Sequence, residues 1–321
     1  MTTDQRRNCV ITGAAGFIGS QLADHLLAQG HAVTAIDNLS WGKKDFLAHN
    51  LANERYTFID IDLLDKAALN ERFPKQIDTV FHLAANSDIM RGTLEPEIDL
   101  KNTTIATFNV LDAMRAHDVK QIFFTSGSGV YGDVGETYTD ENFSPLLPIS
   151  MYGASKLSAE AMISAFVNLY DMRAWILRPA NIIGRRATHG VIFDFINKLR
   201  ANPRTLEIFG DGQQSKSYLY VDDVIDAINL VWTTAREPVN VYNIGSNTFI
   251  NVTEIAEVVI ESMGLSGTEL QYTGGARGWK GDVPVVRLDC SKIEALGWRT
   301  KFTSREAVQQ TTQDILETTS A

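Results

Sequence analysis

Residues 8–19 of the chain read Asn8-Cys9-Val10-Ile11-Thr12-Gly13-Ala14-Ala15-Gly16-Phe17-Ile18-Gly19. The first five residues are apolar and rich in β-formers, and the spacing of apolar residues over 17–29 predicts a helix. Gly13 permits a tight turn between the two, Gly16 lets the backbone approach a pyrophosphate, and Gly19 permits close packing of the helix on the strand. This strand, turn and helix predict a dinucleotide-binding fold.

A second apolar strand is predicted at 31–36, and Asp37 follows it. A carboxylate about twenty residues beyond the glycines can accept hydrogen bonds from the adenosine ribose and repels a 2′-phosphate. Asp37 therefore favours NAD over NADP as the cofactor. The alternative is that Asp37 only caps a loop before Asn38.

Strands and helices continue to alternate along the first half of the chain. This alternation predicts an α/β fold, a doubly wound parallel (Rossmann) sheet with ligands at the carboxyl ends of its strands. Further strands are predicted at 56–59, 79–83, 121–125 and 173–177, and further helices at 65–73, 102–116 and 152–170. We predict a Rossmann domain over 1–178 and a smaller α/β substrate-binding lobe over 179–321, with 212–245 returning to the first domain.

Tyr152 and Lys156 are four residues apart in one predicted helix. They therefore lie on the same helix face, where the ammonium favours the phenolate. Such a phenolate can take a proton from a sugar or alcohol hydroxyl while hydride leaves for a nicotinamide. The spacing alone is common on surface helices, but with the glycine stretch upstream it predicts an active site.

Composition limits the possible functions. The 321 residues are 44% hydrophobic and carry a net charge of -10, and no basic patch stands out, so nucleic acid is not expected as a partner. There is no long apolar run, and the chain begins with polar residues, so neither a membrane span nor a signal peptide is expected. Cys9 and Cys290 show no metal-binding spacing, so no metal is expected, and a reducing cytoplasm is the expected compartment.

Motifs over nearly the whole length resemble those of the NAD-dependent epimerase/dehydratase family of extended short-chain dehydrogenases/reductases, whose members act on nucleotide-diphosphate sugars. These motifs are the glycine stretch, Asp62-Leu63, His82-Leu83-Ala84-Ala85, Val130-Tyr131-Gly132, Tyr152 with Lys156, Arg178-Pro179-Ala180-Asn181, Gly210-Asp211-Gly212, Tyr220-Val221-Asp222-Asp223-Val224, Asn243-Ile244-Gly245, Gly281-Asp282 and Leu296-Gly297-Trp298.

The resemblance also implies the site residues. Those implied for NAD are Gly13, Gly16, Phe17, Ile18, Gly19, Asp37, Asn38, Asp62, Leu63, Leu83, Ala84, Ala85, Asn102, Thr125, Tyr152, Lys156 and Pro179. Those implied for a nucleotide-diphosphate sugar, most simply a UDP-sugar, are Ser87, Ser128, Asn181, Arg185, Val191, Ile192, Lys216 and Arg277. Lys216 stands where the family has arginine, so it offers a phosphate a positive charge but no bidentate fork.

The chain departs from the family at the catalytic Ser or Thr position, which Gly127 occupies. Ser126 and Ser128 flank it, and we favour Ser128 as the replacement donor over Ser126, although a serine here can also be a simple turn former. The two positions after Gly127 are Ser128 and Gly129, where 4,6-dehydratases of the family carry Asp and Glu. The family chemistry that needs no such pair is 4-epimerisation through a transient 4-keto sugar, which makes the expected enzyme an isomerase.

Three alternatives stay open at this point. Arg185 and Arg186 could meet a C6 carboxylate, which would make UDP-glucuronate the substrate of an epimerase or decarboxylase in place of UDP-glucose or UDP-galactose. Another dehydratase or reductase of the family is the second alternative. The third is an NAD-binding sensor or scaffold, which the loss of the hydroxyl at Gly127 would suit. The resemblance further implies a homodimer in which the helices at 102–116 and 152–170 form a four-helix bundle with their partners, unless both faces pack inside the monomer.

Overall fold

A computed structural model describes residues 6–318. Residues 1–5, which belong to the polar stretch that the expectation about a signal peptide concerns, lie outside the described residues. Its centre is a seven-stranded sheet in the order β11-β6-β5-β4-β1-β2-β3, in which every pairing from β3 across to β6 is parallel. The α/β doubly wound fold predicted from the sequence is confirmed. The strands are β1 Asn8–Thr12, β2 Ala32–Asp37, β3 Tyr56–Asp60, β4 Thr79–His82, β5 Gln121–Thr125, β6 Arg173–Pro179 and β11 Val239–Ile244.

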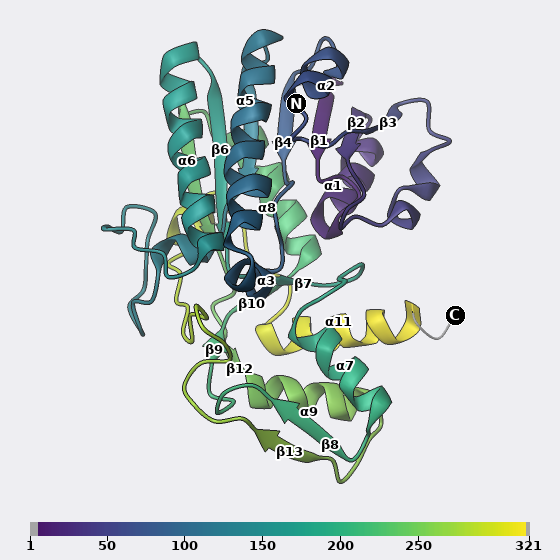
Figure 1. The fold of residues 1–321 in the computed structure, drawn as a ribbon, viewed down its shortest axis with the longest axis vertical. Coiled ribbons are helices and arrows are strands. Elements are labelled where there is room, and N and C mark those ends of the chain that lie inside the picture. The colour runs from purple at the N-terminus through teal and green to yellow at the C-terminus, as the bar shows by residue number, and fades with distance from the viewer. Residues whose placement is uncertain (1–5, 319–321) are drawn as a thin grey trace. The chain divides into compact units, whose positions relative to one another are not determined.

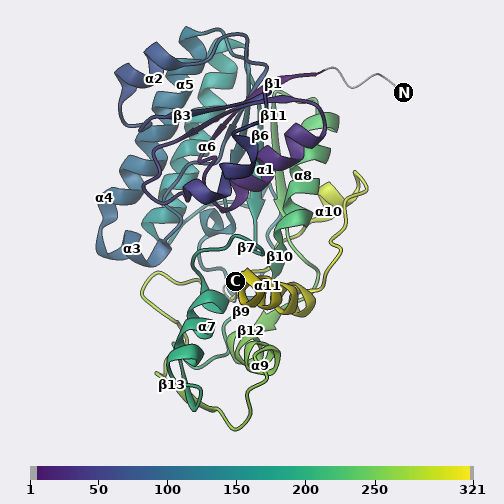
Figure 2. The ribbon, with the colours of Figure 1, turned by 90° about the vertical axis from the view of Figure 1, so that its right-hand side faces the viewer.

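Helices follow most of these strands, as parallel crossovers require. Figures 1 and 2 show α5 and α6 side by side on one face of the sheet and α1 on the other. The helices between β1 and β6 are α1 Phe17–Ala28, α2 Lys66–Arg72, α3 Ile89–Leu94, α4 Pro96–Asp99, α5 Ala106–Ala116 and α6 Met151–Tyr170, with short helical turns η1 Lys44–Phe46, η2 Ala48–Asn50, η3 Leu100–Ile105 and η4 Ser128–Tyr131. Asp65 caps α2 by accepting a hydrogen bond from Ala68 N at 3.0 Å.

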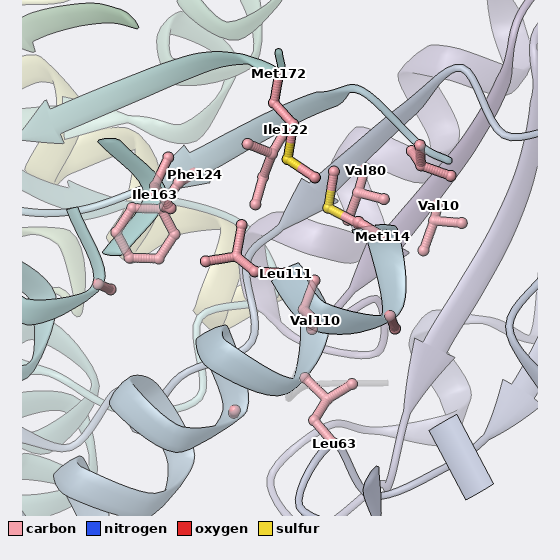
Figure 3. Packing of buried hydrophobic residues seen from close by; sticks show 14 of the residues in the cluster. Val10, Leu63, Val80, Val110, Leu111, Met114, Ile122, Phe124, Ile163 and Met172 are labelled. Carbon is pink, nitrogen blue, oxygen red and sulfur yellow. The ribbon is translucent and has the colours of Figure 1, made fainter. Parts of the chain in front are cut away.

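One hydrophobic core fills the space between the sheet and helices α2, α5 and α6. Alternate strand residues point to this face, because side chains along a strand alternate between faces. Figure 3 shows the strand residues Val10, Val80, Ile122 and Phe124 with Val110, Leu111 and Met114 of α5. The packing fixes the strands, and therefore fixes where their carboxyl ends and the following loops lie.

The helix predicted over 102–116 differs from the observed one. Only Ala106–Ala116 is α-helical, and the preceding turn, Leu100–Ile105, is a π-helix. A π turn has nearly the same apolar spacing as an α turn over so short a length, so the periodicity of the sequence does not distinguish them.

The chain divides into two compact units. Among the described residues, the first comprises 6–126, 155–177 and 231–241, and the second comprises 127–154, 178–230 and 242–318. The second unit has its own core, formed mainly by α7, α9, α11, β8 and β10. The remaining elements, most of them in this unit, are β7 Asn181–Ile183, β8 Thr205–Ile208, β9 Ser215–Lys216, β10 Tyr218–Tyr220, β12 Ile250–Asn251, β13 Glu269–Tyr272, α7 Val191–Ala201, α8 Val221–Thr234, α9 Val252–Ser262, α10 Ser291–Glu294 and α11 Ser304–Thr318.

Among residues 6–318, no helix combines the length and the apolar character that crossing a membrane requires.

Candidate active site

The turn after β1 and the first turn of α1 each have one position with room only for glycine. Gly13 has φ +70°, and a Cβ there would lie 2.8 Å from Ala84 N, while a Cβ at Gly19 would lie 2.2 Å from Gly13 O. Helix α1 therefore starts close against the strand ends. Its N-cap is Gly16, and no side chain of the described residues caps it. The first N–H groups of α1 are thus available to an anion such as a pyrophosphate.

Asp37, the last residue of β2, is held beside this turn by two backbone donors. Its Oδ2 accepts from Ala15 N at 3.0 Å and its Oδ1 accepts from Leu39 N at 2.8 Å. Burial raises the pKa of this carboxyl, and the two hydrogen bonds oppose the shift. A carboxylate fixed in this way next to the glycine turn suits the ribose hydroxyls of a dinucleotide.

His82 at the end of β4 is part of a buried hydrogen-bond network. Its ring nitrogens are hydrogen-bonded to Thr12 Oγ1 at 2.7 Å and Thr107 Oγ1 at 2.9 Å. Complete burial, together with the charge of Lys156, lowers the pKa of His82 to about 3, so the imidazole is neutral. Thr12 Oγ1 also accepts from Ala84 N at 3.3 Å. This network fixes the backbone of Ala84 against the glycine turn.

Lys156 is buried on α6, and its ammonium points to the end of β5. Its Nζ donates to Thr125 O at 2.7 Å and lies 4.9 Å from the centre of the Phe124 ring. Burial lowers the pKa of Lys156 to about 8, and the carboxylates of Glu160 and Asp99 oppose this shift. The lysine is therefore mainly charged at neutral pH but close to its titration range, as is typical of functional ammonium groups.

Tyr152 lies one helical turn before Lys156 on the same helix. Two glycines border its phenol: a Cβ at Gly127 would lie 3.4 Å from Tyr152 Oη, and one at Gly129 would lie 3.8 Å from Tyr152 Cδ1. Residues 127–129 therefore bring no carboxylate to this side of the tyrosine. Gly127 has φ 179° and ψ 162°, an extended conformation that any residue can adopt.

The two flanking serines differ in environment. Ser126 Oγ is buried and has no hydrogen-bond partner among the described residues. Ser128 is half-buried at the start of the turn η4. This turn is anchored by Tyr131, whose hydroxyl donates to Asn243 Oδ1 at 2.7 Å and accepts from Arg178 Nη1 at 3.0 Å. The hydrogen bonds of Tyr131 therefore fix the backbone of the turn that carries Ser128.

The two cations predicted for a diphosphate both lie near Asp282 in the second unit. Lys216 Nζ is 2.7 Å from Asp282 Oδ1, and both side chains are largely buried. Arg277 donates to Asp282 O at 3.0 Å and to Asp133 Oδ2 at 2.6 Å. Each cation is thus oriented by a carboxylate before any ligand binds.

Gln214 belongs to the same cluster, although no motif of the sequence points to it. A Cβ at Gly210 would meet both Gln214 Nε2 and Arg277 O, so these groups are close neighbours. Both amide atoms of Gln214 and the indole Nε1 of Trp279 are buried without a hydrogen-bond partner among the described residues. Buried polar groups are normally satisfied, so these atoms are candidate ligand contacts. Their burial is a tertiary property that no local pattern reveals.

Arg185 is engaged by the protein itself. Its guanidinium forms two contacts with the Asp222 carboxylate, at 2.7 and 2.9 Å. The hydrogen bonds to Asp222 raise the pKa of Arg185 despite partial burial. A carboxylate on a ligand would have to compete with Asp222 for this cation.

The remaining residues predicted to bind NAD or the sugar nucleotide lie after or at the ends of strands, or at the start of helices. Asp62 and Leu63 follow β3, and Leu83, Ala84, Ala85 and Ser87 follow β4, whereas Asn38 follows β2 and Asn102 lies in the π turn η3. Phe17 and Ile18 begin α1, Thr125 and Pro179 end β5 and β6, Asn181 begins β7, and Val191 and Ile192 begin α7. Most of the residues predicted to bind NAD therefore lie where a doubly wound sheet binds its ligand.

Comparison with known proteins agrees with this arrangement. The sequence model of the "NAD dependent epimerase/dehydratase family" matches residues 9–245. The chain belongs to the NAD-dependent epimerase/dehydratase family. The family resemblance predicted from the sequence is confirmed, and NAD is the cofactor, as Asp37 and the glycine turn predict.

Members of this family are similar to the chain over almost its full length. The UDP-glucose 4-epimerase of Mycolicibacterium smegmatis is 32% identical over 310 residues, which are 95% of this chain and 97% of that protein. A crystal structure of a UDP-galactose 4-epimerase is 38% identical with a TM-score of 0.86 and covers 97% of this chain and 99% of its own. The UDP-glucose 4-epimerase of Thermotoga maritima with UDP-glucose is 32% identical with a TM-score of 0.87, and the same shares are covered.

Proposed function

We propose that this member of the family is a UDP-hexose 4-epimerase that interconverts UDP-glucose and UDP-galactose. The observation that carries the proposal is the surroundings of Tyr152, where Gly127 and Gly129 border the phenol and no carboxylate stands at residues 127–129. Elimination of water from the sugar needs an acid and a base in addition to the tyrosine. Epimerisation at C4 needs only one proton carrier and a hydride store.

In this proposal Tyr152 takes the proton from the sugar O4 as the C4 hydride leaves, and returns it after the 4-keto sugar has turned. Bound NAD supplies the reversible hydride acceptance. Lys156, one turn away, provides the positive charge that favours the phenolate. Its hydrogen bond to Thr125 O fixes the ammonium at the end of β5. Ser128 supplies the hydrogen bond to O4 that the residue at position 127 cannot give.

The diphosphate of the sugar nucleotide is assigned to Lys216 and Arg277, whose carboxylate partners orient them. Gln214 and Trp279 add polar atoms that no described residue satisfies. The pairing of Arg185 with Asp222 supports a neutral hexose over a uronic acid, because both terminal nitrogens of Arg185 are used in a bidentate pair with one carboxylate. Lys216 differs, because its ammonium has three donors and Asp282 takes one of them.

The test is incubation of the purified protein with UDP-glucose, UDP-galactose or UDP-glucuronate, followed by proton NMR of the anomeric signals. We expect the first two to interconvert and UDP-glucuronate to remain unchanged. The Tyr152→Phe variant is the control. Conversion of UDP-glucuronate alone would identify UDP-glucuronate as the substrate in place of the two UDP-hexoses. No conversion of any of the three sugars would favour an NAD-binding sensor or scaffold.

We also propose a homodimer through α5 and α6. Exposed apolar side chains lie on these helices and on the turn before α5; they are Leu100, Ile105, Phe108, Met151 and Leu169. The two helices lie side by side on one face of the sheet, so a second copy can pack against them as a four-helix bundle (Figure 1). Light scattering should give about twice the monomer mass. Phe108→Glu should give the monomer. Leu51→Glu, which replaces an exposed leucine outside these helices, should leave the dimer intact.

A further inference from the structure

A pocket of about 340 Å³ opens at the amino ends of the sheet strands, opposite to the strand ends that carry the cofactor residues. Its polar side chains come from residues immediately before or at the start of strands β1, β4, β5, β6 and β11. The lining residues are Arg6, Arg7, Asp78, Gln121, Arg173, Trp175, Trp232 and Arg236. The volume lies at the lower end of the range of small-molecule sites.

The pocket carries an excess of positive charge. Four arginines face one carboxylate, that of Asp78, which also accepts a hydrogen bond from Asn8 N at 2.7 Å. None of the four guanidinium groups forms an ion pair with a carboxylate of residues 6–318. Four like charges with only one opposite charge among the lining residues repel each other, so an anion bound here would relieve the repulsion.

Arg173 gives the second indication of a ligand. Its backbone N–H is fixed by Lys120 O at 2.7 Å as the first residue of β6, but its side-chain Nε is buried without a partner in the described residues. Buried guanidinium donors are expected to be satisfied, because an unpaired one loses its hydration without compensation. An anion in the pocket would supply the acceptor.

Two further guanidinium groups are held in place before any ligand binds. Arg7 lies over the Trp232 ring at 4.4 Å from its centre. Arg236 donates to Ala235 O at 3.1 Å, at the end of helix α8. The indole N–H groups of Trp175 and Trp232 are already used, by Ala235 O and Thr79 Oγ1. The two indole rings therefore form an apolar wall of the pocket, and the arginines are the groups that can bind an anion.

We propose that this pocket binds a small anion with a diphosphate group. Guanidinium forks match phosphate oxygens in geometry and charge. A diphosphate carries roughly three negative charges near neutral pH, which balances the four arginines and Asp78. This site is separate from the one assigned to the sugar nucleotide, and it does not depend on the proposed reaction.

Calorimetry with inorganic pyrophosphate tests the proposal on the full chain with NAD bound, and no nucleoside diphosphate is added, because it would compete for the pocket. We expect a saturable site with a dissociation constant below about 1 mM, and the pocket variants identify that site. Arg173→Gln and Arg6→Gln should each weaken binding at least about tenfold, as expected for losing one charge-assisted hydrogen bond. Arg72→Gln, an exposed arginine of α2 outside the pocket, should leave it unchanged.

Arg6 precedes the first strand and is exposed, so its replacement keeps the test valid if Arg173→Gln does not fold. Inorganic phosphate and ADP serve as further probes. Weaker binding of phosphate supports the diphosphate, and ADP binding as tightly as pyrophosphate identifies a nucleotide as its source. Absence of pyrophosphate binding, or binding that neither pocket variant weakens, would overturn the proposal.

Discussion

Removal of the Ser128 hydroxyl tests whether Ser128 donates the hydrogen bond that the family's Ser or Thr at position 127 would give. Ser128→Ala should slow hydride transfer by about 10²-fold, the usual effect of losing one positioned donor. Ser126→Ala should have little effect, since we assign the hydrogen bond to Ser128.

The structure also predicts a rescue. Gly127 is extended, and a Cβ there would lie at ordinary van der Waals distance, 3.4 Å, from Tyr152 Oη. A serine hydroxyl, one bond further, would lie beside the phenol without backbone strain. Adding Gly127→Ser to Ser128→Ala should therefore restore most of the lost rate. Gly127→Ala in the same background is the matched control, because it adds the Cβ without the hydroxyl.

The assay is single-turnover reduction of bound NAD by UDP-glucose, followed by the absorbance of the reduced nicotinamide. An unchanged rate in Ser128→Ala would end the assignment of this serine. Equal rescue by alanine and serine at position 127 would show that a packing change, and not a donor, is responsible.

Three other predictions concern the cofactor and the Tyr152/Lys156 pair. Tyr152→Phe should abolish turnover while NAD stays bound, because only the proton carrier is lost; activity within about tenfold of the unmodified enzyme would refute its role. The chain should bind NAD at least about tenfold more tightly than NADP in calorimetry, and Asp37→Asn should narrow the difference; equal binding by the unmodified chain would remove that role. Because burial lowers the pKa of Lys156 from 10.5 to about 8, the unfolded chain binds more protons between these values. Stability relative to Lys156→Met should therefore rise as the pH increases above 8, by up to about 1.4 kcal/mol per pH unit in urea unfolding, and a fall would contradict the shift.

The sequence predicts the first half of the fold well, because strong local patterns determine it. Four central strands of the sheet, β1, β4, β5 and β6, are almost fully buried, and the sequence places Asp37 within one residue of the end of its strand. In contrast, β9 and β12 have two residues each, too few for any periodicity.

Properties that depend on distant residues could not be predicted. Asp222, the partner of Arg185, is 37 residues away, and nothing local indicates the pairing. The sequence showed no basic patch, yet the fold gathers Arg6, Arg173 and Arg236 with Arg7 around one pocket. Only the parallel topology brings the amino ends of those strands together.

In the proposed reaction, the C4 hydride leaves the sugar and returns to the opposite face of the 4-keto sugar. UDP-glucose deuterated at C4, incubated with the enzyme in ordinary water, tests it directly by NMR. We expect UDP-galactose that retains the deuterium at C4, with no net reduction of NAD. Loss of the label to solvent, or a product altered at C5 or C6, would contradict it.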